Sequence, residues 1–346
     1  MDSGYVETEH LLRVLEFRIN EHYGQAEREI QQKIEKFYAD FARLDEKNRI
    51  KVKNGELSKS DYTEWRKNKM IMGKRWENMK EVIATDLYHK NDLAQSMVFG
   101  FMPEVYATNH NYGTYEIERK GINTGYTLYD AEAVERLMSE NPDLIPIKYR
   151  KIHEATDIRW NRKNCQSVMI QAILQGESIP DIAKRFSRVI GQKNKATCIR
   201  NARTMTTSAR NAGRNDAYER AARLGVKQIR EWCATHDGRT RDSHRWLDRE
   251  QRAIGEPFSN GLLYPADPNG APAEVYNCRC RIKSIPQGLT PRARATYDDT
   301  IMGMSYEEWK KGHNAPHIMP KVQPKHVMAK KSVKDVKRGQ ISATEI

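Results

Sequence analysis

An apolar stripe near the start of the chain constrains the fold more than any other feature of the sequence. Its members follow one another at steps of three or four residues: Leu11, Leu15, Ile19, Tyr23, Ala26, Ile30, Ile34, Phe37, Phe41 and Leu44. Residues at this spacing lie on one face of an α-helix, and charged residues fill the other faces. The stripe therefore predicts one long helix, packed either on the next helix of the chain or in a coiled coil with a second copy.

The residues after the stripe predict a turn and a second helix. Asn54-Gly55 is a turn signal, and Ser58 followed by Asp61 is typical of a helix N-terminus. The apolar face of the second helix consists of Trp65, Met72, Trp76, Met79, Ile83 and Leu87. Because two helices joined by a short turn pack antiparallel, we expect an N-terminal helical hairpin.

The helical pattern then weakens in a segment rich in Gly, Asn and Tyr. The residues expected to break the helix there are Tyr106, Asn109, Asn111, Tyr112 and Gly113. Asn123-Thr124-Gly125 predicts a turn ahead of a short helix that begins near Asp130, and Asn141-Pro142 with Pro146 marks a candidate boundary.

Helical and basic sequence follows this boundary. Ser178 with Pro180 predicts a helix start, and a further helix spans Ala196 to Arg223. After Gly225 the sequence is rich in Gly, Pro, Asn and Asp, with short apolar pieces at 226–229 and 281–285 that predict strands. Beyond them we expect a flexible polar tail that contains one short helix around Tyr306–Trp309.

These elements predict a mainly α fold. It combines a long N-terminal helical hairpin and a helical middle region with a small, loop-rich α+β domain near the C-terminus. The expected domains are an N-terminal helical domain over 1–145, a basic helical region over 146–225, a compact domain over 226–285 and a flexible, basic tail over 286–346.

The charge of the chain predicts a polyanionic partner. Its 346 residues carry a formal net charge of +13, and nucleic acid is the commonest partner of such a protein, although the excess can also serve solubility alone. The five cysteines are an odd number scattered over a long chain, which indicates synthesis in a reducing cytoplasm rather than a secreted disulfide framework. No apolar run approaches the length of a membrane span, so no membrane partner is expected.

Much of the excess charge lies in one region. Residues 181–230 contain thirteen Lys or Arg against three acids. Within them Arg200, Arg203, Arg210 and Arg214 are spaced to share one helical face. A row of guanidinium groups can contact phosphates without reading sequence, so these four are the candidate DNA-binding residues. The alternative is a solvated or protein-binding face.

The compact domain holds the most unusual local sequence. The segment from Trp232 to Asp248 reads W-C-A-T-H-D-G-R-T-R-D-S-H-R-W-L-D, and Asn277 begins N-C-R-C. Together with the Arg- and Thr-rich helix before them, these motifs resemble the Mu F-like family of phage minor head (head morphogenesis) proteins. The resemblance covers roughly residues 155–285.

The resemblance implies a minor capsid protein of a tailed bacteriophage, and not an enzyme. Such a protein acts in procapsid assembly and is found in the host cytoplasm during assembly and then in the virion, inside the phage head. The implied partners are the portal protein, other capsid or scaffold proteins and double-stranded DNA, which it would bind without sequence specificity.

Two interpretations of the polar residues in this domain stay open. A structural network is expected from Asp237, Arg239, Arg241, His244, Asp248 and Asn277. Within it Asp237 and Asp248 are expected to pair with Arg239, Arg241 or Arg245, because buried charges need partners. Many relatives carry C-x-x-C where this chain has Arg241 and His244, and those relatives can offer four thiolates to zinc. Here the matching metal ligands are only His244, Cys278 and Cys280, with Cys233, His236 or Asp237 as a fourth from outside the motif.

We therefore expect no cofactor, with a structural zinc ion as the alternative. A different class of function would use the same three residues: a metal-dependent nucleic-acid-processing enzyme with His244 in its active site. However, no second carboxylate pair, phosphate loop or nucleophile motif accompanies them. A cellular nucleic-acid-binding protein unrelated to phage is the third alternative.

Overall fold

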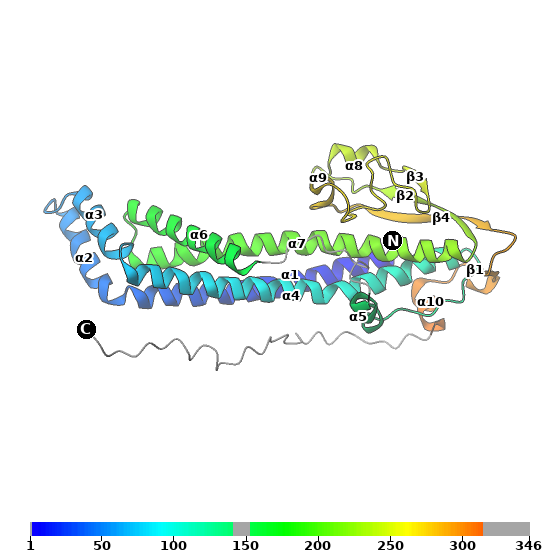
Figure 1. The fold of residues 1–346 in the computed structure, drawn as a ribbon, viewed down its shortest axis with the longest axis horizontal. Coiled ribbons are helices and arrows are strands. Elements are labelled where there is room, and N and C mark those ends of the chain that lie inside the picture. The colour runs from blue at the N-terminus through cyan, green and yellow to red at the C-terminus, as the bar shows by residue number, and fades with distance from the viewer. Residues whose placement is uncertain (1, 141–152, 314–346) are drawn as a thin grey trace.

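The computed structural model describes residues 2–140 and 153–313 of the chain. Within them, three long helices lie side by side along the molecule, α1 (Ser3–Phe37), α4 (Lys74–Glu118) and α7 (Ile179–Arg223) (Figure 1). A further helix, α6 (Glu154–Leu174), packs on α4 and α7 toward one end. The mainly α fold predicted from the sequence is confirmed.

The apolar stripe forms the buried face of α1. Its members from Leu15 to Ile34 are buried, and α1 packs on α4 and α7 of the same chain. The stripe does not, however, lie on a single helix. Tyr38 leaves the helical conformation with φ −103° and ψ 9°, and α2 (Ala39–Lys53) starts after it. The Tyr38 hydroxyl donates to the Met70 carbonyl at 2.8 Å, which fixes the chain at this break.

The predicted hairpin turn is confirmed, and it leads into a short helix before the long one. Gly55 takes φ +77°, and Ser58 caps α3 (Lys59–Met70) by accepting from the Asp61 N–H at 3.0 Å. A second turn at Gly73, with φ +93°, then separates α3 from α4. α2 and α3 together close one end of the bundle, and α4 returns antiparallel to α1 (Figure 1).

The prediction that the helix breaks near Tyr106–Gly113 is wrong, because α4 continues to Glu118 through Pro103. The polar residues of this stretch are buried and bonded within the fold. Asn109 donates to Thr8 at 2.7 Å, and Asn111 donates to the Tyr129 carbonyl at 2.8 Å. Side-chain hydrogen bonds to neighbouring elements thus offset the weak helix propensity of these residues.

α7 is likewise one continuous helix of 45 residues, where the sequence predicted two pieces. Its start is as predicted, with Ser178 as N-cap and Pro180 in the first turn. Two glycines allow α7 to lie close to α4. A Cβ atom on Gly213 would come within 2.5 Å of the Tyr106 carbonyl oxygen, and one on Gly113 within 3.1 Å of the Ala217 Cβ.

The compact domain lies on α7 near the far end of the bundle (Figure 1). Its antiparallel sheet has the order β3-β2-β4. The strands are β2 (Val226–Cys233), β3 (Gln251–Ala253) and β4 (Arg281–Leu289), and the helices are α8 (Asp242–Trp246) and α9 (Pro272–Val275). The strands predicted at 226–229 and 281–285 are therefore confirmed. One hydrophobic core runs from α1, α4 and α7 into this domain, across the predicted boundaries at 145 and 225.

The first part of the predicted tail is folded, so the expectation of flexibility from residue 286 is wrong up to His313. β4 continues to Leu289, and β5 (Thr296–Tyr297) pairs with β1 (Ile122–Asn123). After η1 (Asp299–Ile301), the predicted short helix is present as α10 (Tyr306–Gly312), with Trp309 buried against α4. Aromatic burial holds this segment in place.

The turn at Asn123–Gly125 and the helix after Asp130, α5 (Ala131–Glu140), are as predicted. The candidate boundary at Asn141-Pro142 and Pro146 lies outside the described residues, as does the basic sequence after His313. Across the described ranges, no helix has both the length and the apolar composition that a membrane crossing requires.

Candidate functional site

The four arginines predicted to form a DNA-binding face do not share an exposed surface. Arg210 and Arg214 are buried, with 2% and 0% of their surface exposed, so they cannot reach a phosphate backbone. Their inclusion in the predicted face is therefore wrong. The helical spacing is real, but that side of α7 faces α1, α4 and the compact domain instead of solvent.

Both buried arginines join α7 to other elements. Arg214 bonds Asp2 at 2.6 Å and the Ile282 carbonyl at 3.2 Å. Although burial disfavours its charge, the carboxylates of Glu116 and Asp2 hold the pKa of Arg214 above its ordinary value. Arg210 donates to the carbonyls of residues 279 and 280 at 3.2 and 3.1 Å. These are structural contacts.

The other two arginines of the row remain exposed. Arg203 pairs with Glu16 of α1 at 2.5 Å and keeps half of its side chain in solvent. Arg200 donates to the Thr197 hydroxyl at 3.4 Å on the same exposed surface of α7. Further exposed cations on α6 and α7 are Arg159, Lys163, Lys184, Arg188 and Lys193.

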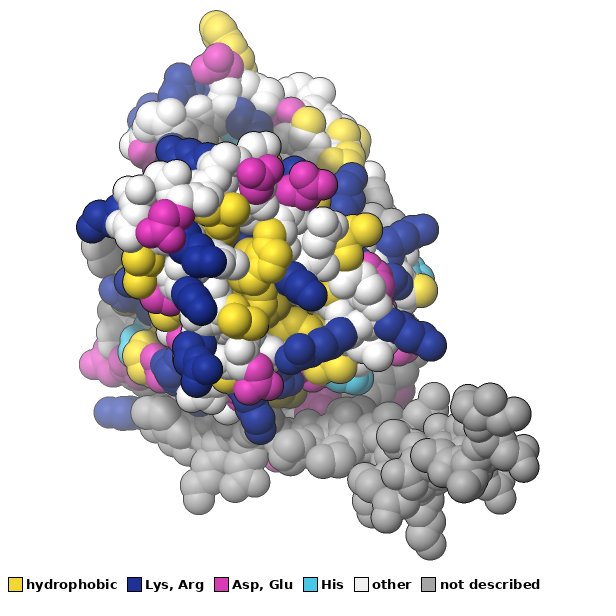
Figure 2. All heavy atoms as spheres, turned by 90° about the vertical axis from the view of Figure 1, so that its left-hand side faces the viewer, with side chains coloured by type: hydrophobic (Ala, Val, Ile, Leu, Met, Phe, Trp, Pro, Cys, Tyr) yellow, Lys and Arg dark blue, Asp and Glu magenta, His cyan; other side chains and the backbone are white. Residues whose placement is uncertain are grey.

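An exposed apolar patch lies at the end of the bundle formed by α2, α3 and the C-terminal end of α6. We call this surface the bundle end. Figure 2 shows apolar side chains gathered near its centre, with Lys and Arg side chains and some Asp and Glu side chains around them. The large exposed apolar residues of these elements are Leu44, Ile50, Met72 and Leu174. The exposed cations are Arg43, Lys47, Lys53, Lys59, Lys69, Lys74 and Arg75.

A buried ion pair supports the bundle end from below. Arg66 is fully buried and pairs with Asp45 at 3.0 Å, which joins α3 to α2. The same guanidinium donates to the Glu177 carbonyl at 2.5 Å, in the turn between α6 and α7. The ring of Phe41 stacks on Trp65 with centroids 4.9 Å apart. These contacts join α2 and α3, which bear the exposed apolar residues, to each other and to the turn between α6 and α7.

In the compact domain, the predicted structural network is present with different partners. Asp237 forms a two-pronged ion pair with Arg279, one contact being 2.7 Å, while Arg239 is farther away at 3.9 Å. The hydrogen bonds from Arg279 and from the Arg239 N–H hold the pKa of Asp237 well below its usual range. Arg241 reaches the Tyr276 carbonyl.

Asp248 and Asn277 shape the backbone in this network. Asp248 accepts from the Ala234 N–H at 2.8 Å and lies 3.2 Å from His236, where the sequence predicted an arginine partner. Asn277 takes φ +57°, a left-handed conformation that Asn tolerates, and its N–H donates to Thr204 of α7 at 3.0 Å.

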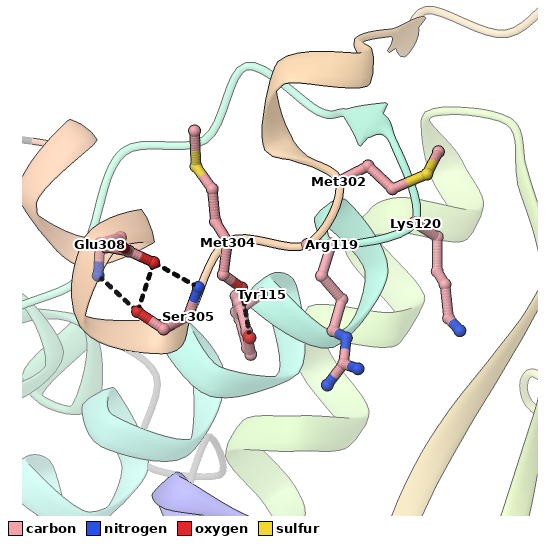
Figure 3. Close-up of a pocket in the computed structure, with 8 residues that line it drawn as sticks. Tyr115, Arg119, Lys120, Met302, Met304, Ser305 and Glu308 are labelled. Carbon is pink, nitrogen blue, oxygen red and sulfur yellow. Dashed lines mark hydrogen bonds between the residues drawn. The ribbon is translucent and has the colours of Figure 1, made fainter.

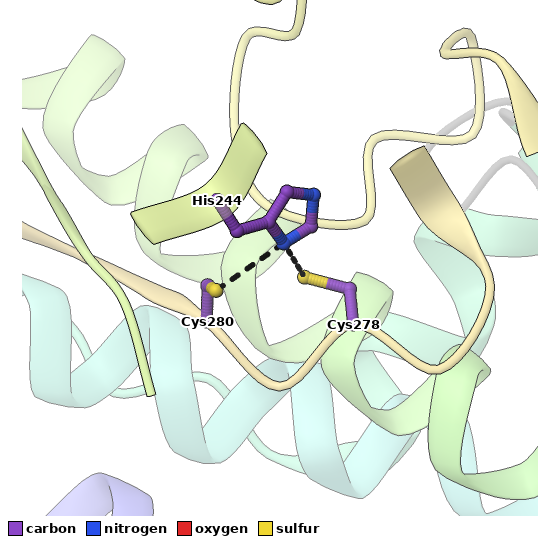
Figure 4. A group of neighbouring side chains, drawn as sticks. All are labelled: His244, Cys278 and Cys280. Carbon is purple, nitrogen blue, oxygen red and sulfur yellow. Dashed lines mark hydrogen bonds between the residues drawn. The ribbon is translucent and has the colours of Figure 1, made fainter. Parts of the chain in front are cut away.

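The three predicted metal ligands lie together. His244 comes from α8, and Cys278 and Cys280 precede β4 (Figure 4). The His244 Nδ1 lies 3.7 Å from the Cys278 Sγ and 3.5 Å from the Cys280 Sγ. All three residues are buried. The fourth ligands proposed from the sequence lie outside this group: His236 pairs with Asp248, Asp237 pairs with Arg279, and the Cys233 Sγ lies 3.9 Å from the Glu231 carbonyl.

The two thiols differ in acidity. The hydrogen bond from Cys278 and the contact with His244 lower the pKa of Cys280 to about 4, despite burial. Burial raises the pKa of Cys278 well above its usual value.

A hollow beside α10 is a weaker candidate site (Figure 3). Its polar groups are occupied within the fold: the Tyr115 hydroxyl donates to the Met304 carbonyl at 2.8 Å, and Ser305 and Glu308 form a capping box. Arg119 lies over the Tyr115 ring at 5.7 Å. The hollow thus lacks the convergent free groups that a ligand site needs.

Two partners in the site were missed in the sequence. Glu274 bonds the His244 Nε2 at 3.0 Å, and Arg279 is the main partner of Asp237. Because Arg279 lies inside the N-C-R-C motif, the motif could have identified it as a partner in the network. Glu274 had no such signal, because its contact with His244 joins residues that lie 30 positions apart in the sequence.

Comparison with known proteins shows which family the chain resembles. Residues 163–283 match the family model described as Phage Mu protein F like protein. The chain is 28% identical over 276 residues to minor head protein GP7 of Bacillus phage SPP1, an alignment that covers 76% of this chain and 84% of that protein. No solved structure matches.

A second relative carries an enzyme name. The chain is 26% identical over 224 residues to the NAD(+)--arginine ADP-ribosyltransferase EFV of Enterococcus faecalis. That alignment covers 60% of this chain but only 45% of the relative, so the chain spans less than half of that protein. The activity in its name is that of the whole relative, of which this chain matches less than half.

Proposed function

Because the chain is a Mu F-like phage minor head protein, we propose that it joins the phage head by docking its bundle end onto the portal protein. In this proposal its exposed cations on α6 and α7 hold packaged DNA without reading sequence. The protein acts by binding, as a structural component, and not by catalysis.

The observation that carries the docking proposal is the composition of the bundle end. Met72, Leu174, Leu44 and Ile50 are 64%, 58%, 55% and 51% exposed at the same end of the bundle, whereas Phe17 of α1 and Trp246 of α8, which are 67% and 87% exposed, lie on separate elements. Exposed apolar groups that are rimmed by charge mark protein interaction sites. DNA would gain little from such a patch, since phosphates and sugars are polar. The occupant is therefore a protein surface.

The charged side chains around the apolar centre and the buried ion pair beneath it determine which partner surface can bind. Lys and Arg side chains border the apolar centre, with Asp and Glu side chains among them, so a complementary surface carries apolar side chains flanked by charges of both signs (Figure 2). The ion pair of Arg66 with Asp45 holds α2 and α3 in place before binding. A preorganised surface loses less conformational entropy on association.

In this proposal, DNA is held by Lys and Arg side chains of α6 and α7 that are exposed to solvent. Lys163 of α6 and Lys193 and Arg200 of α7 are exposed, and Lys193 lies 3.5 Å from Asn164, so cations of the two helices are neighbours. Contacts of this type release counterions from DNA, which makes binding weaken as salt rises.

Co-purification with the portal protein of the same phage tests the docking proposal. The variant Met72→Glu/Leu174→Glu places two negative charges at the bundle end, and we expect portal affinity to fall at least about tenfold. The control is Phe17→Glu, since Phe17 is 67% exposed on α1 away from the bundle end. Equal retention of both variants by the portal would rule the bundle end out.

DNA binding has its own test. Reversing Lys163, Lys193 and Arg200 to Glu should reduce the slope of log affinity against log salt by about 2 to 3, at about 0.9 per lost phosphate contact. Reversing three exposed cations outside α6 and α7, Arg13, Lys227 and Lys311, is the matched control. A slope that both triple variants lower equally would show only a response to net charge.

A further inference from the structure

Two sulfur atoms converge on one nitrogen in the compact domain. The Cys278 and Cys280 Sγ atoms lie 3.7 and 3.5 Å from the same His244 Nδ1 (Figure 4). An imidazole nitrogen has one lone pair, in the plane of the ring, so it can accept one well-directed S–H hydrogen bond and not two. Hydrogen bonding alone therefore accounts for one of these contacts.

The partner of the second ring nitrogen of His244, Nε2, decides which of the two nitrogens carries the proton. The His244 Nε2 lies 3.0 Å from the Glu274 carboxylate, which only accepts when it is ionised. In the neutral ring Nε2 must then donate, which leaves Nδ1 bare and directed at the sulfurs. A carboxylate behind the distal nitrogen is the arrangement that orients histidine ligands toward metals.

The spacing fits a tetrahedral ion. With bonds of about 2.3 Å to sulfur and about 2.05 Å to nitrogen, a tetrahedral zinc centre separates nitrogen from sulfur by about 3.6 Å. The two measured separations, 3.5 and 3.7 Å, lie on either side of this value. The three ligand atoms all lie within 4.8 Å of one another.

From this geometry we infer that His244, Cys278 and Cys280 bind one zinc ion. Two thiolates and a neutral imidazole cancel the charge of the ion, so the centre can be buried without a counter-charge. Soft sulfur ligands favour zinc over magnesium or calcium. No other His, Cys, Asp or Glu of the described ranges joins the group, and a water molecule takes the fourth position.

The ion would clamp parts of the domain that are otherwise loops. His244 belongs to a helix of five residues, and Cys278 and Cys280 lie between α9 and β4. Arg210 of α7 donates to the carbonyl of Cys280, so the clamp continues into the bundle. This role does not depend on portal docking. A substrate could not reach the ion directly, because His244 is 1% exposed and each cysteine 2%.

Metal analysis of the full chain, purified without chelator, tests the inference. We expect one zinc per chain, and the protein with Co²⁺ in place of zinc should show the absorption of a four-coordinate, thiolate-bound ion. Cys278→Ser and Cys280→Ser should lose the metal, whereas Cys198→Ser, at a buried cysteine of α7, should keep it. Glu274→Gln should weaken zinc binding about 10- to 100-fold.

A measurement on the unmodified chain covers the case in which the serine variants do not fold. Alkylation followed by mass spectrometry should find Cys278 and Cys280 protected and then exposed when a chelator is added, with Cys233 unchanged. Absence of zinc, together with alkylation rates at both cysteines that a chelator does not alter, would overturn the inference. So would full zinc content in Cys278→Ser.

Discussion

The close packing of α4 on α7 holds the long helices of the bundle together. A substitution at Gly213 tests this packing. In Gly213→Ala the new Cβ would lie 2.5 Å from the Tyr106 carbonyl oxygen and 3.2 Å from the His110 nitrogen. Both atoms belong to the backbone of α4, so no side chain can rotate away. The helices must separate, or the backbone must distort.

The size of the effect follows from two opposing contributions. Overpacking a tight contact costs about 1–3 kcal/mol, and more where backbone must move. Replacing a helical glycine by alanine gains up to about 1 kcal/mol in helix propensity. We expect Gly213→Ala to lose about 2 kcal/mol of unfolding free energy, measured by urea denaturation monitored by circular dichroism.

The control is a glycine in the same type of structure with open space. A Cβ on Gly24 of α1 would meet only a side-chain nitrogen of Arg28, at 3.8 Å. Gly24→Ala should therefore keep the propensity gain and be up to about 1 kcal/mol more stable than the parent. If Gly213→Ala were as stable as Gly24→Ala, the packing of α4 on α7 described here would be wrong.

Two further predictions concern buried charge. Burial and the nearby Glu7 raise the pKa of Glu104 to about 7, so the folded state loses stability as pH rises from the ordinary value of 4.5 through about 7. Glu104→Gln should match the parent at pH 4.5 and exceed it above pH 7 in urea melts; a constant difference across this range would reject the assignment. Arg230 is buried and donates to four oxygen atoms of residues 215, 253, 256 and 263. Arg230→Ala should cost about 3 kcal/mol or more, against less than about 1 kcal/mol for the partly exposed Arg252→Ala, and a comparable loss in both would contradict the account.

The sequence predicted those parts of the fold that local chemistry decides. Ser58 and Ser178 cap helices where the pattern placed them, and Gly55 makes the predicted turn. The stripe from Leu15 to Ile34 is buried as a helical face. Each of these outcomes depends on neighbours within a few residues along the chain.

The errors arose where distant elements decide the outcome. The stretch around Asn109 and Asn111 reads as a break, but contacts with Thr8 and Tyr129 keep it helical. Arg210 and Arg214 read as a cationic surface, but their partners come from α1, α4 and β4. Helical spacing shows that residues share a face and does not show what covers that face.

The same reasoning explains what could be predicted of the candidate sites. The order of motifs around Asp237, His244 and the two cysteines was sufficient to group them, because each motif holds its residues close in sequence. The bundle end was not predicted. Leu44 was assigned to the buried stripe, and only the break at Tyr38 turns it to solvent.

Site-specific photo-crosslinking in assembled procapsids tests the central claim most directly. A photo-reactive amino acid at position 72 of the bundle end, compared with the same group at position 17 of α1, reports which surface touches another head protein. We predict that position 72 crosslinks to the portal and that position 17 does not. Portal crosslinks from position 17 alone would contradict the docking of this chain through its bundle end.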